Sequence, residues 1–419
     1  MMLHRAFFLF VVSFFLPALA ADAKPRAREL GVPFDGSPGP LNAITDVAGV
    51  EVGHVTLISG EGKLETGRGP VRTGVTAILP RGKDPHAAPV FAGTFALNGN
   101  GEMTGTAWIE ESGFLEGPIV LTNTHSVGVA HDAVIAWQIR AFGKNPPVFF
   151  GSLPVVAETW DGWLNDIDGF HVKPEHVFAA LDKARSGPVA EGGVGGGTGM
   201  VCYEFKGGIG TASRKLSSSL GGYTVGVLVQ ANHGIRRQLI IAGVPVGREI
   251  GGGSRRFAGS DPHDLAGASV GEAGSILIII ATDAPLLPHQ LKRLARRASL
   301  GLARTGSVSG NGSGDLFLAF STANASAGRD EGGPVEIQAL PNASMSPLFE
   351  ATVEAVEESI VNALVAGETM TGRDNHVVEA LPIPRLQEIL AKYHRLSPPL
   401  NSRHDEAPPA RAAASVTPP

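Results

Sequence analysis

The sequence predicts an α/β (α+β) protein in which helices lie outside two packed sheets. Short apolar runs typical of strands are mixed with longer helical patterns, and the two do not alternate strictly as they would in a parallel βαβ protein. Glycine is unusually abundant, at 55 of 419 residues, which indicates many tight turns and close approaches between backbones. Together these observations favour a layered sandwich.

The predicted elements follow from local patterns along the chain. Alternation of Val50, Val52 and Val55 with polar residues predicts a first strand. Further strand-like runs occur at Val75–Leu79, Ile119–Leu121, Val148–Phe150, Tyr223–Val229 and Leu239–Ala242. Helical patterns occur at Val129–Phe142, Pro174–Lys183, Pro285–Ala303 and Pro347–Ala366. We expect Asp283 to cap the third of these helices and Ser346, followed by Pro347, to begin the fourth.

The first twenty residues have the pattern of a secretory signal. The apolar segment Phe7–Leu16 is too short to span a bilayer, and Ala18-Leu19-Ala20 fits a cleavage site for small residues. We therefore expect a signal peptide at 1–20 and export, to a bacterial periplasm. The mature protein should have no membrane segment, because no later run is long and apolar enough.

The rest of the chain divides into three predicted parts. A polar leader covers 21–29, and a single catalytic domain covers 30–395. The Pro/Ala-rich tail, 396–419, is predicted to be disordered.

Composition excludes several classes of function. The net charge is −6 and there is no basic block, so nucleic acid is not an expected partner. Cys202 is the only cysteine, which rules out a disulfide within the chain and a thiolate metal site, and we expect it to be buried and structural. There is no His-Glu-x-x-His motif for a zinc peptidase. We expect neither a metal nor a cofactor.

One junction carries the main functional hypothesis. The run Ile276–Ile280 predicts a strand buried on both faces, and it directly follows Gly274-Ser275. Before the junction lies a Gly/Ser/Asp-rich stretch, 251–274, without apolar periodicity. Cleavage between Gly274 and Ser275 would give Ser275 a free α-amine with a pKa near ~8, able to act as the base for its own hydroxyl. The alternative is an ordinary entry from a loop into a strand.

Other candidate residues lie where apolar runs end. Asn232 closes such a run and could donate to an oxyanion, or it could cap the turn before Gly234. Ser313 and Asp315 form a hydroxyl–carboxylate pair that could hold the amine of Ser275, or they could form an Asx-type turn. Glu158 follows an apolar run and could recognise a cationic amine, or it could be a solvated acid in a surface turn.

Two further patterns favour structural interpretations. The glycine run 191–200 lacks the Gly-Lys-Ser/Thr ending of a phosphate-binding loop, so we interpret it as a turn where backbones approach closely. The histidines are scattered, and His125, His131 and His233 could each be core or surface residues.

Several segments resemble the L-aminopeptidase D-amidase/D-esterase family, which includes the β-peptidyl aminopeptidases. The most distinctive are Asn98-Gly99-Asn100-Gly101-Glu102-Met103-Thr104-Gly105 and Thr122-Asn123-Thr124-His125-Ser126. The remaining matching segments are Leu41–Gly53, Gly69–Pro80, Ala281–Pro285 and Met370–Asp374, and the resemblance covers roughly residues 30 to 390.

The resemblance implies a four-layer αββα sandwich, like that of the N-terminal-nucleophile hydrolases but with different connectivity. It implies a precursor that cuts itself between Gly274 and Ser275, leaving chains 21–274 and 275–419 associated. It assigns Ser275 as nucleophile, Asn232 to the oxyanion hole and Ser313 with Asp315 to the new amine.

The same resemblance implies how substrate is bound. It places Glu158 in the substrate pocket as an acid. Trp160 stands where some members have Tyr, and its indole can offer only an N–H at a different reach. Some members carry Glu where this chain has Asp315.

The predicted function is therefore a serine aminopeptidase or amidase. It would release N-terminal residues from peptides, amino acid amides or esters through an acyl-enzyme, as a homo-oligomer of cleaved protomers. One alternative is an acyltransferase similar to the ornithine acetyltransferases. The other is a non-enzymatic periplasmic binding protein.

Overall fold

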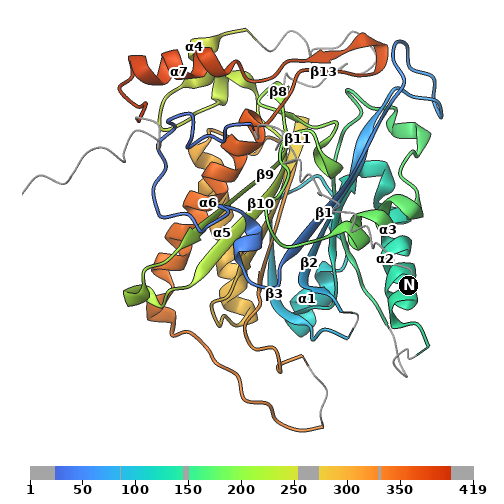
Figure 1. Cartoon of the computed structure of the whole chain (residues 1–419), viewed down its shortest axis with the longest axis vertical. Helices are drawn as coiled ribbons and strands as arrows, with labels where there is room; N and C mark the ends of the chain where they lie inside the picture. The colour runs from blue at the N-terminus through green and yellow to red at the C-terminus, as the bar shows by residue number, and fades with distance from the viewer. Residues whose placement is uncertain (1–23, 85, 145–150, 253–272, 329–331, 398–419) are drawn as a thin grey trace, which may run out of the picture.

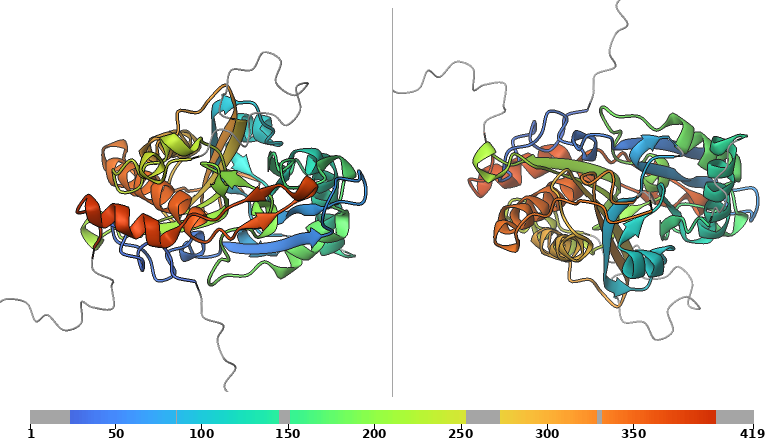
Figure 2. Two further views of the ribbon diagram at one scale, coloured as in Figure 1. Left: turned by 90° about the horizontal axis from the view of Figure 1, so that it is seen from above. Right: turned by 90° about the horizontal axis from the view of Figure 1, so that it is seen from below.

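The computed structural model describes residues 24–84, 86–144, 151–252, 273–328 and 332–397, and these form four layers (Figure 1). Two sheets face each other in the middle, and helices cover both outer faces. The two views of Figure 2 keep this order, with α5 and α6 on one side and α2 and α3 on the other. The predicted αββα sandwich is confirmed.

The smaller sheet has four strands in the order β1-β2-β5-β6. Only the pair β5–β6 is parallel. The strands are β1 (Glu51–Ser59), β2 (Val71–Lys83), β5 (Ile119–Asn123) and β6 (Val155–Thr159). Helices α2 (Val127–Phe142) and α3 (Pro174–Lys183) pack on its outer face, where Val120 meets Val134 and Leu181 in one apolar cluster.

The larger sheet has six strands in the order β4-β3-β12-β11-β10-β9. Its strands are β3 (Val90–Gly99), β4 (Phe114–Leu115), β9 (Gly208–Lys215), β10 (Thr224–Asn232), β11 (Ala273–Thr282) and β12 (Gly312–Ser321). β11 and β12 are parallel, and helix α5 (Pro288–Arg304) provides the crossover that such a pair requires. Helix α6 (Ser346–Val365) lies beside α5 on the outer face.

Smaller elements complete the described chain. They are α1 (Thr106–Ser112), α4 (Val246–Ile250), α7 (Ile383–Lys392), β7 (Val201–Cys202), β8 (Phe205–Lys206), β13 (Met370–Thr371) and β14 (Val377–Val378). Short 3-10 turns are η1 (Ile44–Asp46), η2 (Thr124–Ser126), η3 (Ile167–Gly169), η4 (Gly195–Gly197), η5 (Ser218–Leu220), η6 (Arg236–Gln238), η7 (Asn342–Ser344) and η8 (Arg373–Asn375). None of the described helices is both long and apolar enough to cross a membrane.

Strand β11 shows why the sequence specifies this layering. Its five consecutive apolar residues are fully buried, as predicted. Ile276, Ile278 and Ile280 face α5 and α6, whereas Leu277 and Ile279 face the smaller sheet. Side chains alternate across a strand, so an unbroken apolar run fits a strand covered on both sides. Burying each of these side chains contributes roughly 1.5–3 kcal/mol.

Two local expectations change on comparison with the structure, and a third is not tested. Helix α5 begins at Pro288, and the Asp283 carboxylate accepts a hydrogen bond from the backbone N–H of Thr224 (2.7 Å) instead of capping the helix. The predicted strand Leu239–Ala242 is only an isolated bridge between Ile241 and Val244. The predicted strand Val148–Phe150 lies outside the described residues. Helices α2, α3 and α6 match the predicted ranges within two residues.

The glycine run 191–200 is a place of close backbone contact, as expected. A Cβ on Gly196 would overlap the side-chain oxygen of Gln230, and one on Gly192 would approach the carbonyl oxygen of Ala366. The end of the predicted polar leader packs against the domain, since Ala27 is fully buried and its N–H donates to Asn362 Oδ1 (3.2 Å). The signal segment lies outside the described residues, as does nearly all of the tail.

Candidate active site

Ser275 lies at the beginning of β11, between two neighbouring strands. In the sheet register it is opposite Asn232 of β10 on one side and Gly314 of β12 on the other. Its side chain is buried, and its Oγ accepts a hydrogen bond from the backbone N–H of Gly314 (3.1 Å). By strand alternation it shares the face of Leu277, which points toward the smaller sheet.

Glycine is required on both sides of this serine. A Cβ on Gly274 would overlap the carbonyl oxygen of Asn232. A Cβ on Gly314 would overlap the carbonyl oxygen of Asn100, which belongs to the segment covering β12. The backbone is therefore packed so closely around Ser275 that side chains on its flanks are excluded.

Asn232 is held firmly by two hydrogen bonds. Its Oδ1 accepts from the N–H of Val201 (2.8 Å), and its Nδ2 donates to the carbonyl oxygen of Trp160 (2.9 Å). These partners lie in the β7 strand and after β6, so Asn232 does not cap the turn before Gly234. An amide Nδ2 has two protons, which leaves one for another acceptor on the side of Ser275.

Ser313 and Asp315 lie on β12 beside the same junction. Gly274 is in register with Ser313, and Ile276 is in register with Asp315. The Ser313 hydroxyl donates to Asp315 Oδ1 (2.7 Å). Both residues are fully buried, and Asp315 Oδ2 has no hydrogen-bond partner. Burial raises the pKa of the Asp315 carboxyl, although hydrogen bonds from Ser313 and Ser309 oppose the shift. A buried carboxylate oxygen without a donor is costly unless a cation joins it.

Glu158 reaches the site from the smaller sheet, at the end of β6. It is buried and not a solvated surface acid. Its carboxylate accepts hydrogen bonds from the Thr124 hydroxyl and from the N–H of Glu102 (3.0 Å). Burial raises the pKa of Glu158, and those two hydrogen bonds partly offset the rise. A Cβ on Gly101 would lie 3.3 Å from both Glu158 Oε1 and the Cα of Gly314, so Glu158 lies near the backbone of Gly314, the register partner of Ser275.

Trp160 contributes to the site in an unexpected way. Its backbone carbonyl holds Asn232, while its side chain is 46% exposed and its ring lies against Gly162. The structure thus places five of the predicted site residues in neighbouring positions, Ser275, Asn232, Ser313, Asp315 and Glu158, and links Trp160 to them only through its backbone carbonyl.

Sequence reasoning missed the residues that hold these side chains in place. Thr124 and Glu102 bind Glu158, and the peptide N–H of Val201 binds Asn232. Glu102 lies in the block 98–105 and Thr124 in the block 122–126, the two most distinctive segments of the sequence, and this position was the only signal that could have found them. Val201 acts through its backbone, so no side-chain pattern could reveal it.

Two of the candidate histidines have partners other than Ser275 in the structure. His233 is buried with its Nδ1 3.8 Å from Cys202 Sγ, and burial lowers its pKa to about 3. His125 Nδ1 lies 3.1 Å from Asp168 Oδ1 in a partly exposed contact. Cys202 is buried, as expected.

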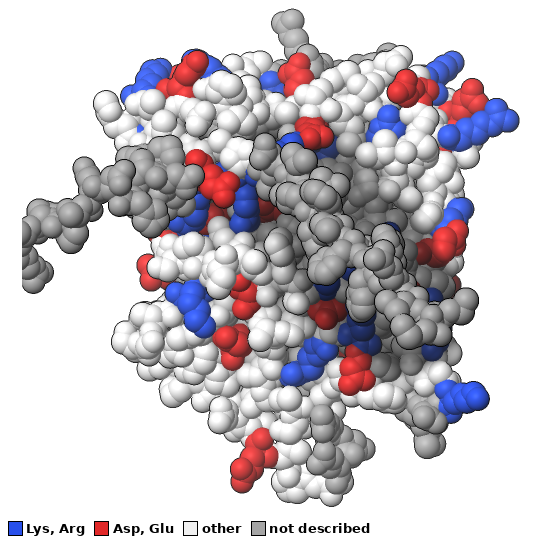
Figure 3. All heavy atoms as spheres, viewed as in Figure 1, with Lys and Arg blue, Asp and Glu red and all other residues white. Residues whose placement is uncertain are grey.

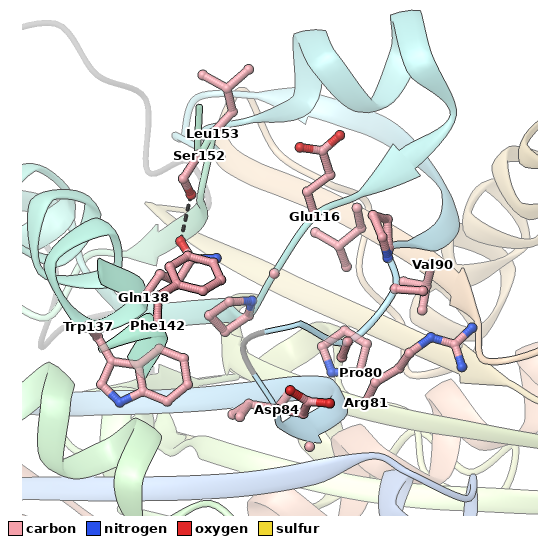
Figure 4. A pocket seen from close by; sticks show the side chains of 18 of the residues that line it. Pro80, Arg81, Asp84, Val90, Glu116, Trp137, Gln138, Phe142, Ser152 and Leu153 are labelled. Atoms are coloured by element: carbon pink, nitrogen blue, oxygen red, sulfur yellow. Dashed lines mark hydrogen bonds between the residues drawn. The ribbon is translucent and has the colours of Figure 1, made fainter. Parts of the chain in front are cut away.

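The two best-defined cavities lie outside the Ser275 site. One, of about 620 Å³, is lined by Trp137, Gln138 and Phe142 of α2 and by Pro80 and Glu116 (Figure 4). It includes none of the six site residues. The other, also of about 620 Å³, is lined in part by Gly101 and Glu102, next to Glu158. On the face shown in Figure 3, acidic and basic side chains are interspersed.

The family model for peptidase family S58 matches residues 42–378. The chain belongs to peptidase family S58. The β-peptidyl aminopeptidase BapA of Sphingosinicella microcystinivorans is 54% identical over 403 residues, which cover 94% of this chain and 99% of that protein. The predicted family is therefore confirmed.

Solved structures from the same group share the fold. A β-aminopeptidase from a Burkholderia species superposes with a TM-score of 0.79 at 49% identity, covering 88% of this chain and 99% of that one. The L-aminopeptidase D-Ala-esterase/amidase of Ochrobactrum anthropi superposes with a TM-score of 0.79 at 48% identity, covering 89% of this chain and 100% of that one. The latter is described as a prototype of the serine aminopeptidases and a new variant of the Ntn-hydrolase fold. This S58 member is accordingly a hydrolase of the serine aminopeptidase type that acts on peptides.

Proposed function

We propose that this S58 member is a self-processing aminopeptidase with Ser275 as its nucleophile. The observation that carries the proposal is the placement of Ser275. It lies near the beginning of the buried strand β11, opposite Asn232 of β10 and beside the Ser313–Asp315 segment of β12, where the buried Asp315 Oδ2 has no hydrogen-bond partner. An α-amine created at Ser275 would supply that donor and would be the base next to the hydroxyl.

Processing would proceed by two balanced steps. The Ser275 hydroxyl attacks the carbonyl carbon of Gly274, the peptide C–N bond breaks, and the nitrogen takes the proton to become a free amine. Water then hydrolyses the resulting ester. The first chain ends in the Gly274 carboxylate, and the second begins at Ser275.

Turnover would use the same groups on a substrate. The Ser275 amine takes the hydroxyl proton while Oγ attacks the substrate carbonyl, and the second Nδ2 proton of Asn232 stabilises the oxyanion. Losing one such donor typically lowers kcat by about 10²–10³. The proton passes to the departing amine, and water hydrolyses the acyl-enzyme. Asp315 and Ser313 orient the Ser275 amine throughout.

Glu158 would bind the amino group of the substrate. It is buried and accepts only neutral donors, so a substrate ammonium would provide its counter-charge. An acid at a fixed distance from the nucleophile explains removal of a single N-terminal residue. Since two relatives that are more than 50% identical are β-peptidyl aminopeptidases, we propose N-terminal β-amino acids as the favoured residues. Export to the periplasm and assembly into a homo-oligomer belong to the same proposal.

The test is intact mass and N-terminal sequencing of the purified protein, together with Ser275→Ala. We expect two fragments from the wild-type chain, one starting Ser275-Ile276-Leu277, and a single inactive chain from the variant. Ser299→Ala, which changes a serine on the outer helix α5, should be cut and active like the wild type. A cleaved, active Ser275→Ala protein would refute the proposal.

A further inference from the structure

Lys206 is a buried lysine close to the site, and the mechanism above does not use it. It ends the short strand β8, and its side chain is 0% exposed. Among the residues that the structure describes, no carboxylate forms an ion pair with it. Instead its Nζ donates to three backbone carbonyls: Gly207 (2.8 Å), Met200 (3.0 Å) and Gly197 (3.2 Å).

One of these carbonyls connects Lys206 to Asn232. The peptide group between Met200 and Val201 accepts from Lys206 through its oxygen and donates to Asn232 Oδ1 through its N–H (2.8 Å). Asn232 in turn donates from Nδ2 to the Trp160 carbonyl, and it lies opposite Ser275 in the sheet register. An ammonium, a peptide group and an amide thus form one continuous hydrogen-bonded chain, and its last member, Asn232, is the register partner of Ser275.

Such a chain has two physical effects. A cation at one end polarises each following group, which strengthens the donor at the far end, and the low dielectric of the interior enhances this cooperativity. The three hydrogen bonds from Lys206 also fix the loop that carries Val201. A rotation of the Met200–Val201 peptide group would break its bond to Lys206 at the oxygen and its bond to Asn232 at the N–H. The hairpin of β7 and β8 is also attached just beyond the end of β10, where the N–H of Tyr203 donates to the carbonyl of His233 (2.7 Å).

We propose that Lys206 is a positioning residue that orients and polarises the oxyanion-binding amide of Asn232 through the Met200–Val201 peptide group. The inference rests on the proposed function, because it assumes that Asn232 stabilises an oxyanion. Lys206 does not touch the substrate, and its contribution reaches the reaction only through Asn232.

The energetics of the site support this assignment. Burial lowers the pKa of Lys206 to about 7, so retaining the charge in this place costs stability. An apolar side chain of similar volume would avoid that cost. In exchange for this cost, the long ammonium side chain with its three protons can donate to three carbonyls at once, which an apolar side chain cannot do.

A double-mutant cycle tests the proposal. Lys206→Met is prepared in the wild-type chain and in the Asn232→Ala variant, and kcat and KM are measured on an aminoacyl p-nitroanilide, per mole of chain shown by mass to be cleaved. We expect Lys206→Met to lower kcat about tenfold with Asn232 present and less than about twofold in the Asn232→Ala background, a coupling typical of one hydrogen-bond network. KM should stay nearly constant in both backgrounds.

Two further variants keep the test decisive. Lys206→Gln retains a donor without the charge and replaces the methionine variant if that one does not fold. Thr198→Val is the matched control, since this buried hydroxyl donates to Gly195 in the same loop (2.6 Å) but is not part of the chain to Asn232. We expect its effect on kcat to be equal in both backgrounds.

The outcomes separate the inference from the function on which it rests. Equal losses of kcat from Lys206→Met in both backgrounds would overturn the positioning role and leave the proposed function intact. An Asn232→Ala enzyme that is as active as the wild type would overturn both. Coupling for Lys206 and none for Thr198 supports the inference.

Discussion

Two regions of the molecule bury charged side chains in opposite ways. In the first, which we call the α6 cluster, every charge has a partner. Glu358 binds both Arg214 (2.9 Å) and Arg28 (2.8 Å), and Arg214 also contacts Glu354 (3.2 Å). The second, which we call the site cluster, consists of Glu158, Asp315 and Lys206. Within the described residues these three form no ion pairs, and they rely on neutral donors or acceptors.

The difference indicates what each region does. In the α6 cluster the ion pairs satisfy one another's charges, and they connect Arg28, at the start of the domain, to helix α6, which follows Ser275 in the chain. After the proposed cleavage, the α6 cluster would connect two separate chains. Buried charges that lack counter-ions have perturbed pKa values and remain available to reacting groups, which is characteristic of active sites. Variants should therefore divide into those that alter rate and those that alter stability.

The largest effect is expected at Asp315. Asp315→Asn removes the acceptor for the Ser275 amine and should lower kcat by about 10²–10⁴, the usual range for acid–base groups. In the uncleaved Ser275→Ala background the same change should not lower stability, because there the buried carboxyl has no amine partner, its pKa is raised and its charge is disfavoured. The measurements are kcat of the cleaved protein and urea unfolding at one protein concentration.

Asp283→Asn is the matched control, since Asp283 lies just beyond the opposite end of β11 and binds the N–H of Thr224. It should reduce stability slightly and leave kcat unchanged. If both variants lost activity equally, the contrast between the two ends of the strand would be wrong.

The next largest effect is expected in the α6 cluster. Glu358→Gln leaves the buried Arg214 and the half-buried Arg28 without their shared partner and should lower the free energy of unfolding by about 3–5 kcal/mol. The kcat of the folded, cleaved protein should not change. Urea unfolding of the variant, with Glu388→Gln at an exposed pair as control, measures the effect. A stable but inactive Glu358→Gln protein would contradict the division into two regions.

The sequence predicted the site better than it predicted some local elements. The pure apolar run of β11 determines a strand covered on both faces, and the position of Ser275 at its start follows directly. The roles of Asn232 and Asp315 could not be separated from turn formation by local pattern alone, because Asn and Asp serve both purposes. Only the sheet register places them beside Ser275.

The wrong predictions of local elements also arise from contacts between segments that are distant in the sequence. Asp283 looked like a helix cap, but its carboxylate binds the start of a neighbouring strand, a contact between distant segments. Leu239–Ala242 is apolar enough for a strand but finds no strand partner among the described residues. The chain from Lys206 to Asn232 passes through a peptide group, which is present at every position and gives no sequence signal.

The smallest effect is a pH dependence at Asp161, which is next to Trp160. Its carboxylate is buried among the side-chain amides of Asn123 and Asn165 (3.0–3.1 Å), and burial raises its pKa from 3.8 to about 6. Because the folded state binds this proton more tightly than the unfolded state, its contribution to stability is full below about pH 4. It is lost as the pH rises through 6, with a total change of about 3 kcal/mol.

The variant Asp161→Asn separates the pH-dependent stability due to Asp161 from the opposite pH dependence due to the buried histidines. His54 and His233 have pKa values lowered by burial to about 4 and about 3, so they remove stability as the pH falls below 6.5. Both histidines are present in both proteins, and their effect cancels in the difference. The stability of the wild type relative to Asp161→Asn should therefore decrease by about 2 kcal/mol between pH 4 and pH 7. Urea unfolding at the two pH values gives this difference, and a constant offset would mean that Asp161 is not protonated in the folded state at pH 4–6.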